Sequence, residues 1–424
     1  MFSERTNWRL SQNRFTQALE EVRAGGAKIL DLTVSNPTRV GLNYDADPIL
    51  AALGSERILD YDPQSQGLLS ARQAVAEYYQ DESAHCGKDI ARNASAEIDP
   101  ERIVLTTSTS EGYSFVFRLL CNPGDELLVP KPSYPLFEFL ADLQDVKLVP
   151  YPLIYDHGWQ IDFHSLESSV TARTRGIVLV HPNNPTGSYV KPSEVEALNS
   201  VCKKRNAALI VDEVFLDYKL HRVETAAPGC PAEPSSTGSL ATVNEHQETY
   251  GTFAHNQEVL TFTLSGLSKI SALPQMKVAW ILTTGPAKQV SAAMERLEVI
   301  ADTYLSMNAP VQCAVPVLLE QRKSVQSQLL DRVRENLSEL DRQLASQKNC
   351  ARLKIEGGWY AILRVPVTRS DEDMAIELLR HHSVLVHPGH FYDFPRDGYL
   401  VLSLIGPAEE FRQGVTRLLG HFKD

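Results

Sequence analysis

The chain has 424 residues, of which 43% are hydrophobic and 22% are charged, and its net charge at pH 7 is −12. This composition is typical of a globular protein with a large core, and it excludes disordered and fibrous classes. The negative charge argues against nucleic-acid binding, because phosphate backbones require compensating cations. The first residues, MFSERTNWRLSQNRF, lack an apolar signal core, and no run of about 18 apolar residues occurs. We therefore expect a cytoplasmic protein that makes no membrane contact.

In chain order, residues 1–45 predict an N-terminal arm: a helix from about Thr6 to Ala24, then the loop VSNPTRVGL at 34–42. Residues 46–300 alternate helical stretches with short apolar runs, and this rhythm predicts a mostly parallel sheet wrapped by helices. The apolar runs are RIVLT at 102–106, ELLVP at 126–130, VKLVP at 146–150, GIVLV at 176–180, ALIVD at 208–212, VLTFT at 259–263 and VAWIL at 278–282.

Residues 301–424 predict a linking helix and a small α+β domain. Leucines and a valine spaced three or four apart between 329 and 344 indicate an amphipathic helix between the domains. Strands are expected in RLKIEGG at 352–358, YAILRVP at 360–366, VLVHPG at 384–389 and YLVLSLI at 399–405, around a helix from about Glu372.

Two further patterns limit the interpretation. Residues 222–258 are rich in Pro, Ser, Thr, Ala and Gly, which predicts a loop insertion on the surface of the large domain. The six cysteines are scattered without C-x-x-C spacing, so we expect neither a metal site nor a disulfide framework.

Three polar residues each follow a β-rich run. Lys269 ends TFTLSGLSK at 261–269, Asp212 lies in LIVDEVFLDY at 209–218, and Asn184 lies in HPNNPTG at 181–187. Open α/β sheets place ligands at the carboxyl ends of their strands. Each residue alone has a plainer interpretation, as a solvated lysine, a capping aspartate or a turn asparagine. Together they offer an amine for an aldehyde, an acid for a ring nitrogen and a donor for a phenolate, which are the groups that pyridoxal phosphate needs.

With these motifs, nearly the whole chain resembles the class I/II aminotransferase family of fold-type I pyridoxal-phosphate enzymes. The resemblance implies that Lys269 forms the Schiff base, Asp212 pairs with the pyridine nitrogen and Asn184 contacts the phenolate. It also implies the fold just described, with a cofactor-bearing large domain and a small C-terminal domain.

Other segments follow in family order. TTSTSEGYSF at 106–115 resembles the phosphate-binding turn before a helix, although Ser and Thr at a helix start also serve as simple caps. PSYPLFE at 132–138 resembles the segment whose ring stacks on the cofactor, here Tyr134. YDPQSQG at 61–67 resembles the segment whose tyrosine, here Tyr61, reaches the phosphate of a partner subunit, which implies a homodimer. The candidates in the phosphate turn are Thr107, Ser108, Thr109 and Ser110.

Several positions depart from the family pattern. Phe215 stands where a tyrosine often contacts the phenolate, and Lys277 stands where an arginine usually holds the phosphate. Gly266 replaces a serine, so phosphate contact is expected from Ser268 or Ser265. A lysine can hold a phosphate as a point charge, but without the paired geometry of arginine.

The position where the family usually has the arginine that binds the substrate α-carboxylate is Val401, in DGYLVLSLIGP at 397–407. Arg39 is the leading replacement, because its loop resembles the family segment that lines the substrate pocket. Asn36 in that loop is a further candidate, and so is Arg364 if its side chain faces the site rather than solvent.

The resemblance implies an aminotransferase that moves an amino group from an amino acid or related amine to a 2-oxo acid in a ping-pong cycle. The motifs leave open a pyridoxal-phosphate lyase, such as a carbon–sulfur lyase, because the same residues support elimination. A non-catalytic cofactor-binding module is a third possibility, disfavoured by the retained lysine.

Overall fold

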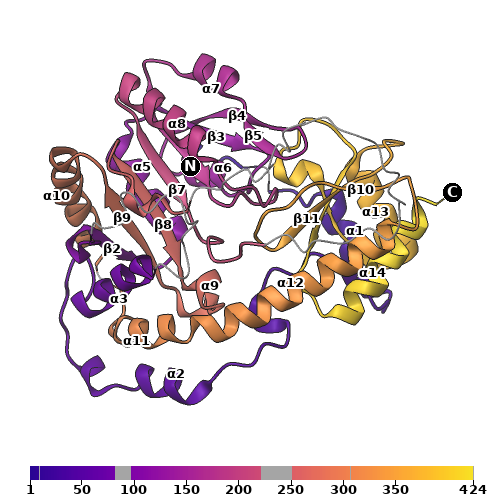
Figure 1. Cartoon of the computed structure of the whole chain (residues 1–424), viewed down its shortest axis with the longest axis horizontal. Coiled ribbons are helices and arrows are strands. Elements are labelled where there is room, and N and C mark those ends of the chain that lie inside the picture. Colours follow the sequence, from indigo (N-terminus) through magenta and orange to yellow (C-terminus); the bar gives the residue numbers. More distant parts are fainter. Residues whose placement is uncertain (9, 82–96, 221–250, 306, 424) are drawn as a thin grey trace, which may run out of the picture.

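The computed structural model describes residues 1–424 except 9, 82–96, 221–250, 306 and 424. Its centre is an eight-stranded sheet whose inner pairs β4–β3, β3–β6, β6–β7 and β7–β8 are parallel, while β5, β9 and β2 pair antiparallel at the two ends (Figure 1). The predicted mostly parallel sheet is thus confirmed. In spatial order the strands are β2 (Ile103–Thr106), β9 (Ala279–Thr284), β8 (Thr261–Gly266), β7 (Ala208–Asp212), β6 (Thr174–Val180), β3 (Glu126–Lys131), β4 (Lys147–Tyr155) and β5 (Trp159–Ile161).

The inner strands are apolar along most of their length because helices cover both faces of the sheet. Ile210 packs on the face that holds α5, whereas Leu209 and Val211 pack on the opposite face. The helices around this sheet are α2 (Ala46–Leu53), α3 (Leu69–Gln80), α5 (Thr109–Leu120), α6 (Phe137–Asp142), α7 (Phe163–Ser169), α8 (Pro192–Arg205), α9 (Leu267–Ile270), α10 (Ala287–Tyr304) and α11 (Ala309–Glu320).

The C-terminal part is built on a four-stranded antiparallel sheet in the order β10 (Ala351–Arg352), β11 (Tyr360–Arg364), β14 (Tyr399–Ser403) and β13 (His387–Pro388). Helices α13 (Asp371–His382) and α14 (Ala408–His421) accompany it. The long helix α12 (Arg322–Leu344) runs from the large sheet to these elements (Figure 1). Its buried positions include Val325, Leu329, Val333 and Leu340, which is the amphipathic spacing read from the sequence.

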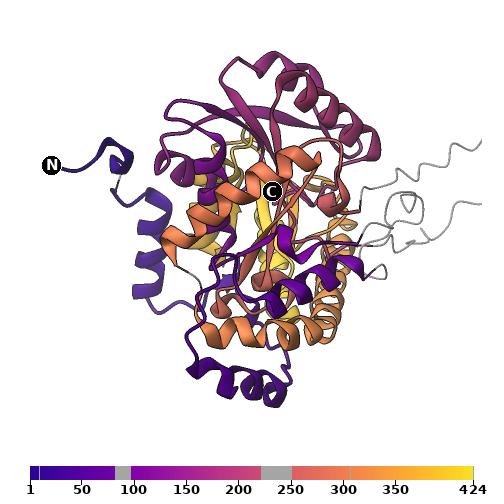
Figure 2. The same ribbon diagram turned by 90° about the vertical axis from the view of Figure 1, so that its left-hand side faces the viewer.

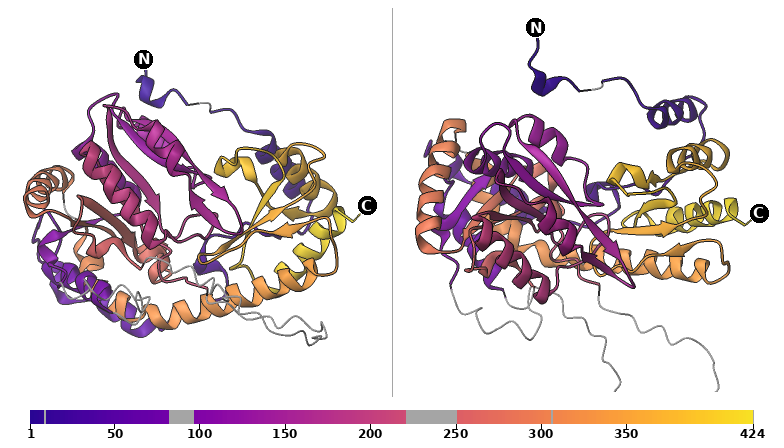
Figure 3. Two further views of the ribbon diagram at one scale, coloured as in Figure 1. Left: turned by 45° about the horizontal axis from the view of Figure 1, so that its top comes forward. Right: turned by 90° about the horizontal axis from the view of Figure 1, so that it is seen from above.

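The N-terminal residues pack with the C-terminal elements. Helix α1 (Arg14–Ala24) lies against α13, and β1 (Leu30–Asp31) pairs in parallel with β12 (Val384–Leu385). Ahead of α1, the first residues reach back to the large sheet, where Arg5 Nε donates to Asp145 at 2.7 Å and Trp8 Nε1 donates to Asp142 at 2.8 Å. Figure 3 shows this segment running between the two parts, and Figure 2 shows that it lies on the outside of the molecule.

Two expectations need correction. The first α-helix was expected from Thr6, but it begins at Arg14, because the Asn13 side chain caps it by accepting from Thr16 N. The expected surface insertion at 222–258 lies mostly outside the described residues. Its described end packs into the core, since Phe253 in the 3₁₀ turn η5 (Phe253–His255) is fully buried. Phe253 N also donates to the buried Glu213 carboxylate at 2.7 Å.

Candidate active site

The strand register brings the three predicted residues to one edge of the large sheet. Asp212, the last residue of β7, pairs with Val180 of β6 on one side and with Leu264 of β8 on the other. Asn184 follows Val180 by four residues, and Lys269 follows Leu264 by five. The carboxyl ends of adjacent parallel strands therefore deliver all three residues to the crevice where such sheets bind ligands.

Aromatic rings surround the Lys269 amine. Its Nζ lies 5.0 Å from the ring centre of Trp359 and 5.7 Å from that of Phe215. Burial lowers the pKa of Lys269 to about 8, against a smaller raising effect of the Asp212 charge. With this pKa about a tenth of the amine is unprotonated at pH 7, far more than for an ordinary lysine, so it can act as a nucleophile or a base.

The short helix that carries Lys269 is fixed through its backbone. Tyr218 Oη donates to the Lys269 carbonyl at 2.7 Å, and Gln326 Nε2 donates to the Ile270 carbonyl at 2.9 Å. Tyr44 Oη donates to the Ala272 carbonyl at 2.8 Å. These contacts come from three distant parts of the chain, and sequence reasoning missed them because no local pattern marks a long-range donor.

The Asp212 side chain is partly buried, and this desolvation raises its pKa to about 6 despite hydrogen bonds from Val214 N and Tyr113 Oη. Tyr113, on α5, donates to Oδ2 at 3.2 Å, and Val214 N donates to Oδ1 at 3.0 Å. A protonated ring nitrogen beside Asp212 would stabilise the ionised carboxylate, which burial disfavours. Tyr113 was not proposed from the sequence, although it lies in the segment that was expected to bind phosphate.

The Asn184 amide suits a ligand contact. Its Oδ1 is buried, and its side chain has no hydrogen-bond partner within the described ranges. The turn that holds it is fixed by Asn183, whose Oδ1 accepts from Thr186 Oγ1 at 2.9 Å. A phenolate oxygen accepts hydrogen bonds, so the group of Asn184 that would contact it is the Nδ2 donor rather than the buried Oδ1.

The N-terminus of α5 is engaged mainly in capping. Ser108 Oγ accepts from Glu111 N at 3.2 Å, and the Glu111 carboxylate accepts from Thr107 N at 2.6 Å. The Ser108 hydroxyl and the Thr107 amide therefore serve to cap the helix, as in the plainer interpretation of this segment. Thr109 and Ser110 begin the helix and are partly exposed, so their amides and hydroxyls remain the candidates for an anion.

The other residues expected to contact the phosphate differ in how exposed their side chains are. Ser265 is fully buried, and its hydroxyl donates to the Glu213 carbonyl at 3.3 Å, so we no longer assign it to phosphate. Ser268 is partly exposed in the first turn of α9. Lys277 is exposed in a left-handed conformation and forms no ion pair with a described residue. Ser268 and Lys277 are therefore accessible to an anion.

The two tyrosine candidates keep exposed rings. Tyr134 is 47% exposed, yet it lies close enough to Asp212 for that carboxylate to contribute to its raised pKa, after the larger effect of burial. Tyr61 is 82% exposed. A ring that stacks on a ligand and a ring that reaches a partner subunit would both be exposed on the surface of a single chain.

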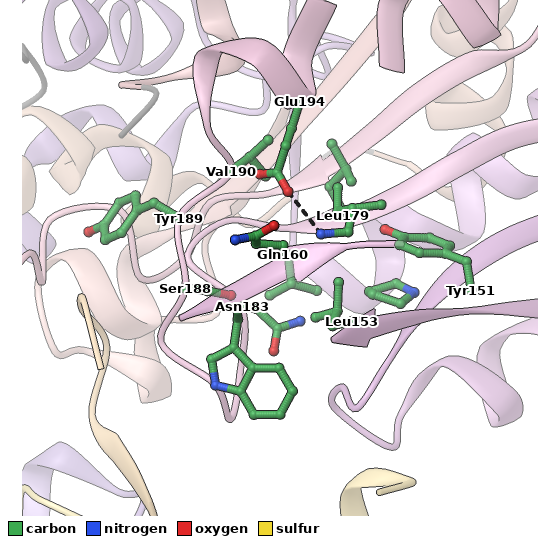
Figure 4. Close-up of a pocket in the computed structure, with 13 residues that line it drawn as sticks. Tyr151, Leu153, Gln160, Leu179, Asn183, Ser188, Tyr189, Val190 and Glu194 are labelled. Atoms are coloured by element: carbon green, nitrogen blue, oxygen red, sulfur yellow. Dashed lines mark hydrogen bonds between the residues drawn. The ribbon is translucent and has the colours of Figure 1, made fainter. Parts of the chain in front are cut away.

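A small crevice lies behind the Asn184 turn (Figure 4), between the β4–β5 hairpin and residues 179–190. Its lining includes Leu153, Leu179 and Val190, and the Glu194 carboxylate at its edge accepts from Ile161 N at 2.8 Å. It contains neither Lys269 nor Asp212, so it is distinct from the candidate active site.

Comparison with known proteins gives these residues a family. The model of the family described as Aminotransferase class I and II matches residues 27–418, which is more than nine-tenths of the chain. The chain is a class I/II aminotransferase. Members of this family generally depend on pyridoxal phosphate.

Relatives of this aminotransferase span nearly its whole length. It is 24% identical over 411 residues to the glutamate-pyruvate aminotransferase AlaA of Haemophilus influenzae, with 94% of this chain and 92% of the relative covered. It is 26% identical over 416 residues to an alanine aminotransferase of Mycobacterium tuberculosis, with 96% and 88% covered. The solved alanine aminotransferase of Pyrococcus furiosus has a TM-score of 0.83 at 20% identity, with 100% of each chain covered, so the predicted fold is confirmed.

The aminotransferase has no arginine at the expected carboxylate position. Val401 is fully buried in β14. Arg39 is exposed in the turn η2 (Pro37–Arg39), and Asn36 caps this turn by accepting from Thr38 N at 3.1 Å and from Thr38 Oγ1 at 2.8 Å. Arg364 is exposed at the end of β11, about 13 Å along the strand from Tyr360. The structure therefore does not place Arg364 beside Lys269.

In the part of the chain that is described, no helix is long and apolar enough to span a membrane, and no cluster of three or more His, Cys, Asp or Glu side chains could hold a metal ion.

Proposed function

We propose that this aminotransferase binds pyridoxal phosphate at the edge formed by β6, β7 and β8. The supporting observation is that a partly buried lysine of lowered pKa, a partly buried aspartate of raised pKa and an unpartnered buried amide follow three adjacent strands. In this proposal Lys269 bonds to the cofactor aldehyde, Asp212 faces the ring nitrogen and Asn184 faces the phenolate. Thr109, Ser110, Ser268 and Lys277 hold the phosphate, and Tyr134 stacks on the ring.

When bound, the cofactor supplies an electron sink that stabilises negative charge on the substrate α-carbon. The protein supplies the rest of the chemistry. When it is not bonded to the cofactor, the Lys269 Nζ would take the proton from the substrate α-carbon and deliver it to another atom. The rings of Trp359 and Phe215 keep Nζ in apolar surroundings, and a pKa near 8 suits a base that works near neutral pH.

We infer that the substrates are an α-amino acid and a 2-oxo acid, exchanged in a ping-pong cycle. L-Alanine, L-glutamate, pyruvate and 2-oxoglutarate are the first compounds to test, because the relatives above are named as glutamate-pyruvate and alanine aminotransferases. Elimination by a lyase gains no support from these relatives. A homodimer in which Tyr61 reaches the partner's site, and a cytoplasmic location, remain predictions.

The test is an absorbance scan of cofactor-loaded protein with each amino acid and no acceptor. We expect L-alanine or L-glutamate to replace the band of the aldehyde form with that of the amine form, and an added 2-oxo acid to reverse the change. Keto product and ammonia released with the aldehyde band unchanged would show elimination instead. Lys269→Ala serves as the inactive control.

A further inference from the structure

One face of the four-stranded sheet is turned to the candidate active site. Val401 of β14 lies directly opposite Ile362 of β11 on one side and His387 of β13 on the other. Opposed residues of antiparallel strands share a face, and so do alternate residues along a strand, so Tyr360 lies on this face too. The Tyr360 ring centre is 6.2 Å from that of Phe215, which borders Lys269. The face that presents valine instead of arginine therefore also presents a tyrosine and a histidine.

Polar groups on this face form a small cluster. His387 Nδ1 lies 3.1 Å from the hydroxyl of Tyr392, a residue of the turn η7 (Gly389–Tyr392). The Tyr392 carbonyl accepts from Ser133 N at 3.0 Å, which places it beside the segment that follows β3. Tyr360 is only 8% exposed, and its hydroxyl has no hydrogen-bond partner among the residues that the structure describes.

Both tyrosine hydroxyls stay protonated over the working pH range. Burial raises the pKa of Tyr360 and of Tyr392, and Tyr134, the ring expected on the cofactor, adds to both shifts by proximity. The cluster thus places two neutral O–H donors near the substrate side of the site. Two such donors suit the two oxygens of a carboxylate, which is acceptor-only when ionised.

We propose that the hydroxyls of Tyr360 and Tyr392 bind the substrate carboxylate in place of the arginine replaced by Val401, with His387 orienting the Tyr392 hydroxyl. This inference rests on the proposed function, because it assigns the carboxylate subsite of the same active site. It replaces Arg39 as the leading candidate, because Arg39 lies exposed in η2. Tyr360 is buried next to Phe215, which borders Lys269, and Tyr392 is buried near Tyr360 and Tyr134.

Carboxylate binding at this subsite should depend on pH, because the single Tyr392 hydroxyl proton can be donated to only one acceptor. Tyr392 can donate to a carboxylate and keep its hydrogen bond to His387 only if its oxygen accepts from Nδ1, which requires a proton on that nitrogen. A carboxylate therefore selects the Nδ1-protonated states of His387, the doubly protonated one most strongly. Burial lowers the pKa of His387, and the charge of Asp31 in β1, among the described residues, acts against this by favouring the protonated ring. Carboxylate binding should raise the pKa of His387 and should weaken as pH rises.

The experiment measures the binding of 2-oxoglutarate to the cofactor-loaded enzyme, as inhibition of the amino-acid half-reaction. We expect Tyr360→Phe and Tyr392→Phe each to weaken this binding by about tenfold or more, the usual loss for a hydrogen bond to a charged group. In wild type the binding should weaken from pH 6 to pH 8, and His387→Gln should flatten that dependence. NMR of labelled histidine should show the His387 pKa rising when 2-oxoglutarate binds.

The controls are Tyr151→Phe, which removes a buried hydroxyl that donates to the Val178 carbonyl, and His157→Gln in an exposed turn. Unchanged binding in both tyrosine variants would overturn the proposal, and a large loss in Arg39→Ala alone would assign the clamp to Arg39. Failure of the proposed function shows separately, as absence of the amine-form band with every amino acid tested while 2-oxoglutarate still binds.

Discussion

The Asp212 carboxyl occupies a position where the protein disfavours its charge. Its pKa is raised from 3.8 to about 6 by burial, which corresponds to about 3 kcal/mol of stability lost once the group is ionised. The sign follows from linkage: as pH rises from about 4 to 6, the unfolded chain releases this proton before the folded chain does. The site is therefore built at a cost in stability, which a bound ring-nitrogen cation would offset.

We predict that Asp212→Asn stabilises the cofactor-free protein. Above pH 6 the gain should be about 1–3 kcal/mol, because the amide carries no charge and still accepts from Val214 N. Near pH 4 and below the variant and wild type should be equally stable. Urea unfolding at pH 4 and pH 7.5 measures both values, and equal stability at pH 7.5 would contradict the assigned burial cost. The same variant should lose nearly all transaminase activity.

A second prediction at this scale concerns Lys269. Its lowered pKa predicts that the cofactor-free protein captures the aldehyde of pyridoxal phosphate at a rate that rises with pH, with a midpoint near 8. Reduction with borohydride followed by peptide mapping gives the rate at this lysine. A midpoint near 10.5, the value of an exposed lysine, would show that the rings of Trp359 and Phe215 do not control the amine.

At the scale of elements, the Asn184 turn is pressed against the loop before β11. Gly187 has φ +67°, and a Cβ there would lie 2.4 Å from the Gly357 carbonyl oxygen. Gly26 offers a matched comparison, because it has φ +71° and nothing within 4 Å of the same atom. Alanine substitutions at these two glycines separate the loss of stability caused by the left-handed backbone from the loss caused by the close contact.

We therefore predict that Gly187→Ala costs about 2–4 kcal/mol of unfolding free energy, whereas Gly26→Ala costs about 1 kcal/mol. Gly187→Ala should also weaken pyridoxal phosphate binding, because the turn that holds Asn184 must shift. Denaturant unfolding and cofactor titration of both variants give the two quantities. Equal costs in the two variants would indicate that the loop yields freely at Gly357.

The elements also show what the sequence could and could not predict. Apolar runs such as ALIVD marked the strands, and with them the positions of Asp212, Asn184 and Lys269, because sheet geometry relates a strand end to the site. The capping role of Ser108, the inward hydroxyl of Ser265 and the burial of Phe253 depend on partners that lie elsewhere in space. Tyr392 and His387 are only five residues apart in the sequence. Their proposed role in carboxylate binding becomes visible only when β13 is seen to pair beside Val401.

At the scale of the molecule, exposed apolar side chains lie in and just before the segment 61–67, whose Tyr61 is expected to reach a partner subunit. Leu50, Leu59 and Tyr61 are 64%, 84% and 82% exposed. We predict a homodimer with twice the 47.2 kDa chain mass, measured by light scattering. Tyr61→Phe should keep the dimer and weaken cofactor binding several-fold, through loss of one phosphate contact. A monomer of full activity would contradict both assignments.

The N-terminal arm has a mechanical consequence. Trp8 is held on the large sheet through Asp142, and Arg14 is held on α13 through Asp373 at 2.6 Å. Six peptide units between these anchors span at most about 20 Å when taut. The arm therefore limits the distance by which the two parts of the molecule can separate while both of these hydrogen bonds are intact. Wider opening for product release requires one anchor to let go first.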